Sequence, residues 1–216
     1  MADRAVGVPF AKEGFPFIGA AAGVTVVTGW LGWTTVAAGA AALTLFVSWF
    51  FRNPPRTIPQ GPGLVVAPGD GTVVAVEEEF EPRYLKDRAI RISIFLNVFD
   101  VHINRIPCEG IVEGVQYQPG LFLIASKPDA TLKNEQNALM IKTGQGIKVL
   151  CVQVAGLIAR RIVCWVNPGE RAVRGERYGL IRFGSRMDTF LPIGTAIKIA
   201  VGDCVKGGET ILGELR

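Results

Sequence analysis

The chain contains one histidine, His102, and this residue is the first candidate for proton-transfer chemistry. It lies in the segment Asp100-Val101-His102, shortly after an apolar run that ends at Val98. Imidazole is the only side chain whose ordinary pKa lies near neutrality, so it is a natural acid or base at physiological pH. The alternative is a structural histidine that is hydrogen-bonded at the end of a strand. The neighbouring residues must decide between these two interpretations.

A Gly-Ser pair near the C-terminal end, Gly184-Ser185, supplies a candidate nucleophile. Serine becomes nucleophilic when an adjacent base takes its proton and a third group orients that base. Asp70, Asp100 and His102 supply those residue types. No G-x-S-x-G motif surrounds this serine, which argues against an α/β-hydrolase and directs the chemistry at the chain's own Gly-Ser bond. Glycine leaves that carbonyl open to attack, although an isolated Gly-Ser pair is also typical of a surface turn.

The segment that precedes these residues is strongly apolar, because no residue from Gly14 to Phe51 is charged. The stretch is broken near Gly29-Trp30-Leu31-Gly32-Trp33, and each half is short against the roughly 20 residues that span a bilayer. Two tight helices or a re-entrant hairpin fit this pattern, with Arg52 and Arg56 as cytoplasmic anchors. A buried pair of soluble helices is the alternative. We therefore expect a membrane-associated helical segment over residues 1–51 and a catalytic domain over residues 52–216.

The charge and the cysteines narrow the class of partner. The net charge of +4 belongs to the second part of the chain, and a basic surface beside a membrane segment favours phospholipid headgroups. The chain has neither zinc-finger spacing nor a basic helix with aromatic residues, so we expect no nucleic-acid partner. The four cysteines form no CxxC pair, so we expect them to be reduced residues of the core, in a domain that faces the cytoplasm. Because the chain has only one histidine, we expect no metal site.

After Arg52 the sequence consists of short runs rich in Val and Ile, separated by Gly and Pro, which is typical of antiparallel strands. We expect strands over residues 71–76, 89–98, 111–117, 147–154, 161–166, 179–183, 196–201 and 210–215. Gly-Asp turns at Asp70 and Asp203 resemble those of biotinyl and lipoyl carrier domains, although no lysine stands where a carrier would have it. The expected fold class is mainly β, a barrel-sandwich-like antiparallel β domain preceded by an apolar helical membrane hairpin.

Taken in order, five segments of the chain resemble the short-form phosphatidylserine decarboxylases. They are Phe50-Phe51-Arg52-Asn53-Pro54-Pro55-Arg56, Ala67-Pro68-Gly69-Asp70-Gly71, Asp100-Val101-His102-Ile103-Asn104-Arg105-Ile106-Pro107, Asn134-Glu135-Gln136-Asn137 and Phe183-Gly184-Ser185-Arg186-Met187-Asp188. The resemblance covers nearly the whole chain. It implies a proenzyme that cleaves its Gly184-Ser185 bond into a large N-terminal chain and a small C-terminal chain. Many longer members carry Gly-Ser-Thr and a second histidine, where this chain has Ser185-Arg186 and Arg105.

The resemblance also implies roles for individual residues. During maturation Asp70 would orient His102, and His102 would take the proton of Ser185 as its Oγ attacks the Gly184 carbonyl. Elimination and hydrolysis would then convert the serine into a pyruvoyl group, which is a covalently bound pyruvate. In catalysis the ketone of this group would condense with the substrate amine and withdraw electrons as carbon dioxide leaves. His102 would return the proton to the product.

Three further residues are candidates for supporting roles under the same resemblance. Asp100 is an alternative orienting acid for the histidine, because the two residues would share one face of a strand. Arg105 and Arg186 are candidates for binding the headgroup phosphate and carboxylate, since both ligands are anionic.

The implied function is decarboxylation of phosphatidylserine to phosphatidylethanolamine at the cell membrane, with the catalytic domain on the cytoplasmic side. Its partners would be the phospholipid substrate, the bilayer and the heterodimer of the two cleavage products, with higher homo-oligomers left open. One alternative is a membrane-tethered serine hydrolase or protease with an Asp70-His102-Ser185 triad and no pyruvoyl group. Another is a non-enzymatic barrel-sandwich adaptor in which Gly184-Ser185 is only a turn.

Overall fold

The computed structural model of the protein describes residues 9–121, 134–156, 161–182 and 185–216. The chain divides into two compact units, Met1–Pro55 and Arg56–Arg216. Its helices and strands are η2 (Lys12–Gly14), α1 (Phe15–Trp30), α2 (Thr34–Phe50), β1 (Leu64–Val66), β2 (Gly71–Glu81), β3 (Asp87–Leu96), β4 (Ile103–Arg105), β5 (Gly110–Gln118), β6 (Gln136–Lys142), β7 (Lys148–Ala155), β8 (Ile162–Cys164), β9 (Arg171–Ala172), β10 (Arg177–Ile181), β11 (Ser185–Pro192), β12 (Ala196–Ile197), β13 (Cys204–Val205) and β14 (Ile211–Glu214).

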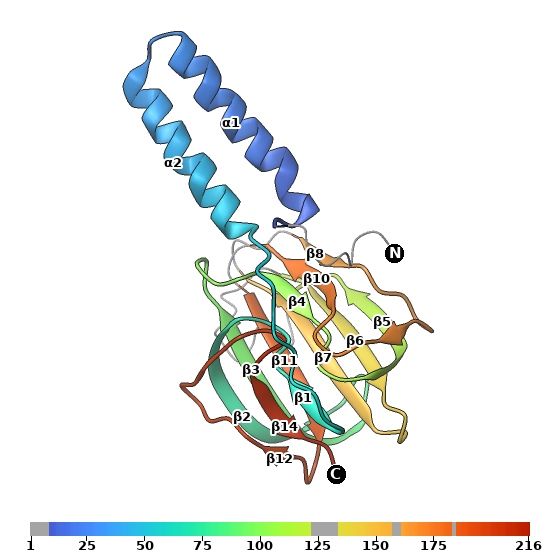
Figure 1. The fold of residues 1–216 in the computed structure, drawn as a ribbon. Helices are drawn as coiled ribbons and strands as arrows, with labels where there is room; N and C mark the ends of the chain where they lie inside the picture. Colours follow the sequence, from blue (N-terminus) through green and yellow to red (C-terminus); the bar gives the residue numbers. More distant parts are fainter. Residues whose placement is uncertain (1–8, 122–133, 157–160, 183–184) are drawn as a thin grey trace. The chain divides into compact units, whose positions relative to one another are not determined.

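The first unit consists mainly of helices α1 and α2, which pack against each other (Figure 1). The hydroxyls of Thr25 and Thr44 lie 3.2 Å apart between them, and Gly32, with a φ of 76°, makes the turn that joins them. The helices contain 16 and 17 residues, which gives lengths of about 24 to 26 Å at the usual rise per residue. Among the described residues no helix is long and apolar enough to cross a membrane. The expected apolar helical membrane hairpin is therefore wrong.

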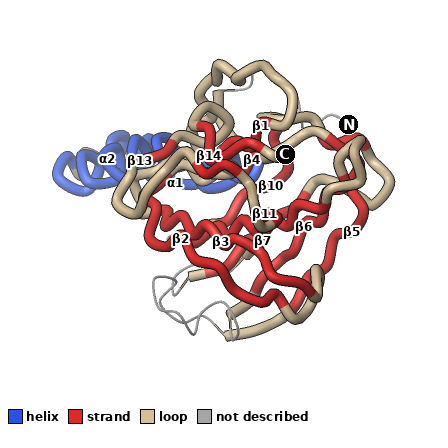
Figure 2. Tube along the Cα trace, turned by 90° about the horizontal axis from the view of Figure 1, so that it is seen from below, coloured by secondary structure: helices blue, strands red, loops and turns tan. Residues whose placement is uncertain are grey.

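The second unit is built from antiparallel strands in three sheets. The large sheet has eight strands in the order β13-β2-β3-β11-β7-β6-β5-β9, and two small sheets have the orders β1-β14-β12 and β4-β10-β8. The large sheet is curled, and β1, β4, β10 and β14 lie on its concave side (Figure 2). The structure thus replaces the expected barrel-sandwich-like domain with a mainly β unit organised around one curled antiparallel sheet.

Two apolar cores lie on the two faces of the large sheet, because successive side chains of a strand point to opposite faces. The larger core contains Leu96 and Met187 from the large sheet, together with Tyr178 and Leu212 from the small sheets. The smaller core, on the other face, contains Val152 and Phe190. A side chain of β11 therefore faces one core or the other according to its position, and Ser185 shares the face of Met187.

All four cysteines are free thiols. Cys108 and Cys151 are buried in the larger core, and burial raises the pKa of each thiol to about 12, so both stay protonated at neutral pH. Cys164 is half-buried and Cys204 is exposed. The expectation of core cysteines is therefore wrong for Cys204, because its two-residue strand β13 lies at the edge of the large sheet.

Candidate active site

Ser185 is the first residue of β11, in the middle of the large sheet. It is paired with Leu96 of β3 on one side and with Ala155 of β7 on the other. Its side chain is fully buried, and its Oγ has no hydrogen-bond partner among the described residues. Buried hydroxyls are nearly always hydrogen-bonded, so an unpartnered one calls for a functional explanation. Gly184, the other residue of the expected cleavage site, lies outside the described residues.

His102 follows β3 through a turn over residues 97–100. The Asp100 N–H donates to the carbonyl of Asn97 at 3.0 Å, and the carboxylate of Asp100 accepts the Asn97 N–H at 2.8 Å. The buried imidazole has its Nδ1 2.9 Å from the backbone carbonyl oxygen of Asp100. A carbonyl only accepts, so Nδ1 carries the proton and the lone pair of the neutral ring is on Nε2.

The strand pairings bring His102 and Ser185 to the same end of the large sheet. Leu96, the last residue of β3 before the histidine turn, is the cross-strand partner of Ser185. On the other side, the N–H of Ile181 at the end of β10 donates to the carbonyl of His102 at 3.4 Å. His102 is thus connected to Leu96, the cross-strand partner of Ser185, and to β10, the strand that precedes Ser185 in the chain.

Asp70 lies in the turn before β2, and its carboxylate is bound by groups other than the histidine. Arg56 Nη2 donates to Asp70 Oδ1 and Oδ2 at 2.9 and 2.7 Å, and the N–H of Gly207 donates to Oδ1 at 2.8 Å. The structure therefore does not bring Asp70 into hydrogen-bond contact with His102. The imidazole Nδ1 instead lies against the backbone carbonyl of Asp100.

Glu209 extends this ion pair from the C-terminal part of the chain. Its carboxylate accepts the N–H of Thr57 at 2.9 Å and lies 3.6 Å from Arg56 Nη1. The Thr57 N–H and the Arg56 guanidinium hold the pKa of Glu209 below its ordinary value. Arg56 is thereby held between two carboxylates that come from opposite ends of the unit.

Arg105, in β4, occupies the position at which many longer family members carry a second histidine. It is buried, and its Nη1 donates to the carbonyl of Gly175 at 2.9 Å. Burial, together with the positive charges of Arg56 and Arg177, lowers the pKa of Arg105 to about 10, and the negative charge of Asp70 opposes this shift. The side chain is nevertheless cationic at neutral pH, so it cannot act there as the neutral base that a histidine provides.

Arg186 is turned away from the serine. It follows Ser185 in β11 and therefore points to the opposite face of the sheet. Its Nε and Nη2 donate to the two carboxylate oxygens of Asp188 at 2.8 and 2.9 Å, and both side chains are buried. This bidentate pairing does not favour the expectation that Arg186 binds the headgroup.

Sequence reasoning assigned no role to the buried amides beside the serine. Asn134 Nδ2 donates to the carbonyl of Ala155, the cross-strand partner of Ser185, at 2.7 Å. Asn137 and Gln153 continue this polar cluster on the face of the larger core. The signal that could have found them is the presence of Asn and Gln inside runs that are otherwise apolar, because a buried amide needs specific partners.

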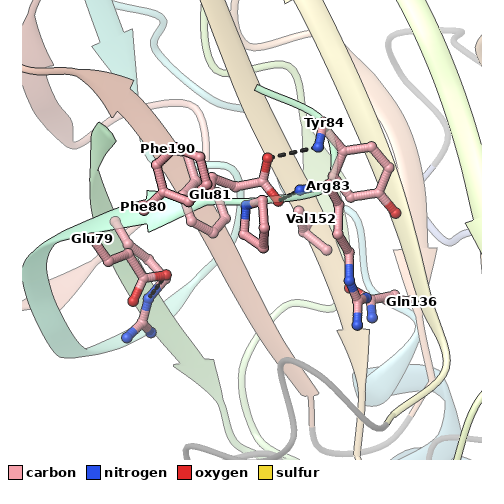
Figure 3. Close-up of a pocket in the computed structure, with 10 residues that line it drawn as sticks. Glu79, Phe80, Glu81, Arg83, Tyr84, Gln136, Val152 and Phe190 are labelled. Carbon is pink, nitrogen blue, oxygen red and sulfur yellow. Dashed lines mark hydrogen bonds and ion pairs between the residues drawn. The ribbon is translucent and has the colours of Figure 1, made fainter. Parts of the chain in front are cut away.

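A cavity of about 350 Å³ lies on the other side of the large sheet (Figure 3). It is lined in part by the β2–β3 turn, where the Glu81 carboxylate accepts the backbone N–H groups of Arg83 and Tyr84, and by Val152 and Phe190. The last two belong to the smaller core, so this cavity is not the site of Ser185. The described part of the chain holds no group of three or more His, Cys, Asp or Glu residues that could bind a metal ion.

Comparison with known proteins gives a consistent result. Residues 43–213 match the phosphatidylserine decarboxylase family. The phosphatidylserine decarboxylase proenzyme of Nitrosomonas europaea is 49% identical over 204 residues, which is 94% of each chain. That of Geotalea uraniireducens is 48% identical over 207 residues, 96% of this chain and 97% of the relative. The family match includes both His102 and Ser185, and the chain belongs to the phosphatidylserine decarboxylase family.

Proposed function

We propose that the chain is a self-processing proenzyme in which Ser185 becomes a pyruvoyl group, and that this group serves the decarboxylation of phosphatidylserine to phosphatidylethanolamine. The observation that carries the proposal is the fully buried Ser185 Oγ, which has no hydrogen-bond partner among the described residues. An unpartnered hydroxyl at the start of a central strand suits a side chain that is consumed during maturation. The relatives are named proenzymes, which supports the same conclusion.

In the proposed maturation His102 Nε2 takes the proton of Ser185 Oγ, and the oxygen attacks the carbonyl carbon of Gly184. The Gly184–Ser185 peptide bond breaks as an ester bond forms in its place, and the proton passes to the released serine nitrogen. Elimination then frees the Gly184 carboxylate and leaves a dehydroalanine. Water adds to its tautomer and ammonia leaves, which converts residue 185 into the ketone. The backbone carbonyl of Asp100 keeps the imidazole in the required tautomer.

When formed, the pyruvoyl group supplies an electron sink for the loss of carbon dioxide from an amine-bearing substrate. His102 is the proposed proton donor to the Cα of the product, because it lies at the same end of the sheet and is buried away from bulk water. The role of Asp70 in this proposal is to stabilise the fold around the site through its ion pair with Arg56.

After cleavage we propose that the two products remain a heterodimer. Strand β11 of the small chain lies between β3 and β7 of the large chain, and β14 and β13 pair with β1 and β2. The interleaved strands support association because separation would expose a central strand and the larger core on both products.

We also propose that the enzyme works at the surface of a membrane, where its lipid substrate resides. Trp30 and Trp33, at the turn of the first unit, are 85% and 58% exposed, and tryptophan is favoured at the interface between lipid and water. This association is peripheral and depends on exposed side chains.

A denaturing mass spectrum of the purified protein tests the central proposal. We expect two fragments that are split after Gly184, the smaller one lighter by the mass of ammonia than its unprocessed sequence. Borohydride should add hydrogen to the ketone of that smaller fragment. An intact chain with a reactive Ser185 would overturn the proposal in favour of a serine hydrolase.

A further inference from the structure

Three buried amide side chains form a hydrogen-bonded chain on the face of the larger core. Asn137 Nδ2 donates to Gln153 Oε1 at 2.9 Å, and Gln153 Nε2 donates to Asn104 Oδ1 at 2.8 Å. Gln153 and Asn104 have no exposed surface, and Asn137 has almost none. The chain ends at Asn104 in β4, two residues after His102.

The orientation of the Asn104 amide follows from its partners. Gln153 Nε2 also lies 3.4 Å from the carbonyl oxygen of Val163, and a carbonyl only accepts, so the Gln153 atom at this position is nitrogen. Asn104 must then present its oxygen to Gln153 and its Nδ2 elsewhere. That Nδ2 is buried and has no hydrogen-bond partner among the described residues. The interior of the unit therefore contains an N–H donor that is held in place and is available to bind an acceptor.

This donor lies close to two residues that neighbour Ser185. A methyl group added at Gly69 would be 3.6 Å from Asn104 Nδ2, 3.5 Å from Met187 Cγ and 3.3 Å from Leu96 Cδ2. Met187 shares the face of Ser185 in β11, and Leu96 is the cross-strand partner of Ser185. The space beside Gly69 is thus bordered by Asn104 and by two neighbours of the serine.

We propose that Asn104 Nδ2 binds the carboxylate of the serine headgroup of the substrate, and that Gln153 and Asn137 are positioning residues that hold the amide. The inference rests on the proposed function, because it takes residue 185 as the centre that engages the substrate amine. The carboxylate is attached to the same carbon as this amine, whereas the phosphate is separated from that carbon by a methylene and an ester oxygen. A donor in the space bordered by the neighbours of residue 185 is therefore better placed for the carboxylate than for the phosphate.

A neutral donor suits a group that is about to leave. The carboxylate loses its charge as carbon dioxide departs, so a cation bound to it would stabilise the ground state more than the transition state. An amide N–H can orient the carboxylate, but it stabilises the negative charge of the ground state less than a cation would. The nearby cations Arg56 and Arg105 are engaged with Asp70 and with the carbonyl of Gly175.

Two variants of Asn104 test the proposal in the full chain. Asn104→Leu removes the donor at similar size. Asn104→Asp keeps an oxygen that accepts from Gln153 but replaces the Nδ2 donor with a second carboxylate oxygen. We expect both to self-cleave and to raise KM for phosphatidylserine roughly 10- to 100-fold with little change in kcat. The inhibition constant of phosphatidylethanolamine, which lacks the carboxylate, should stay the same, as should the amount of this lipid trapped on the enzyme by borohydride.

The pH profile separates substrate binding from a merely structural effect. A protonated carboxyl is again a donor, so KM of Asn104→Asp relative to the parent should fall as the pH is lowered, whereas that of Asn104→Leu should not. Thr189→Val is the matched control, because Thr189 is fully buried two positions beyond Met187 on the same face, and its KM should equal that of the parent. If Asn104→Leu fails to fold, the pH profile of Asn104→Asp decides.

Two results would overturn the inference. One is an unchanged KM in fully processed Asn104 variants. The other is a parallel rise of the phosphatidylethanolamine inhibition constant, which would mean that the amide supports the site without reading the carboxylate. An uncleaved parent chain in the mass spectrum would instead overturn the proposed function, so the two failures are distinguishable.

Discussion

Arg56 and Asp70 form a nearly buried ion pair, with Arg56 Nη2 2.7 Å from Asp70 Oδ2 and side-chain exposures of 7% and 16%. The Asp70 carboxylate, which the sequence analysis expected to orient His102, is therefore bound to Arg56. The imidazole of His102 is held instead by a backbone carbonyl, that of Asp100. Maturation and stability should therefore depend on different residues, which substitutions can separate.

Breaking the Arg56–Asp70 pair should lower the stability of the second unit. Arg56→Gln leaves the Asp70 carboxylate with the Gly207 N–H, so we expect a loss of about 2 to 4 kcal/mol in the free energy of unfolding. The measurement is urea unfolding in the uncleaved Ser185→Ala background. Arg88→Gln is the control, because its pair with Glu78 is exposed and should contribute less than about 0.5 kcal/mol. Equal losses for the two variants would contradict the prediction.

Ser185→Ala should abolish both cleavage and decarboxylation, since alanine has no Oγ to attack the preceding carbonyl. Ser185→Cys should cleave slowly, because a thiolate can form the equivalent thioester. The fraction of cleaved chain is followed over hours by mass spectrometry. Two fragments and a normal rate from Ser185→Ala would disprove self-processing.

The charge of Asp100 should matter less than its hydrogen bond to the turn. Asp100→Asn retains an oxygen that accepts the Asn97 N–H and retains the backbone carbonyl that holds His102, so it should cleave at close to the parental rate. Asp100→Ala loses the side-chain acceptor and should cleave several-fold more slowly, as is typical when a capping group of about 1 kcal/mol is removed. The same time course measures both. Equal impairment of the two variants would mean that the carboxylate charge acts directly.

Glu209 should stabilise the unit in a pH-dependent way. Its pKa is lowered in the folded state by the Thr57 N–H and by Arg56, so its contribution is present above the ordinary pKa of glutamate and is lost as the pH falls through the folded value. Glu209→Gln should lower the free energy of unfolding by about 1 kcal/mol at pH 7, and the difference should shrink in acid. Exposed Glu214→Gln provides the comparison in the same urea titrations. A deficit that grows on acidification would refute this assignment.

Replacing the exposed tryptophans of the first unit should weaken contact with lipid. The double substitution of Trp30 and Trp33 by serine should reduce co-sedimentation with phosphatidylserine vesicles roughly tenfold. Turnover of detergent-dispersed substrate should be unaffected. Phe80→Ser, which alters a similarly exposed aromatic residue of the second unit, should sediment like the parent. Unchanged vesicle binding in the double variant would exclude these side chains as the lipid contact.

Local sequence pattern was sufficient for many elements of the second unit. The expected runs over residues 71–76, 89–98, 111–117 and 147–154 coincide with β2, β3, β5 and β7, because alternation and β-branched residues are local signals. Strands β6 and β11 were missed because they carry buried polar residues. The partners that satisfy them, such as Gln153 for Asn137, lie on other strands that the pattern cannot show.

The sequence by itself determined the family and singled out Ser185 and His102 as the residues whose chemistry fits it. Only the tertiary structure decided the partner of each buried polar group. Asp70 binds Gly207, which is 137 positions away in the chain, and His102 binds a backbone carbonyl that every residue possesses. The physical reason is that a hydrogen bond depends on distance and direction between two groups, and folding alone brings groups from distant positions within reach.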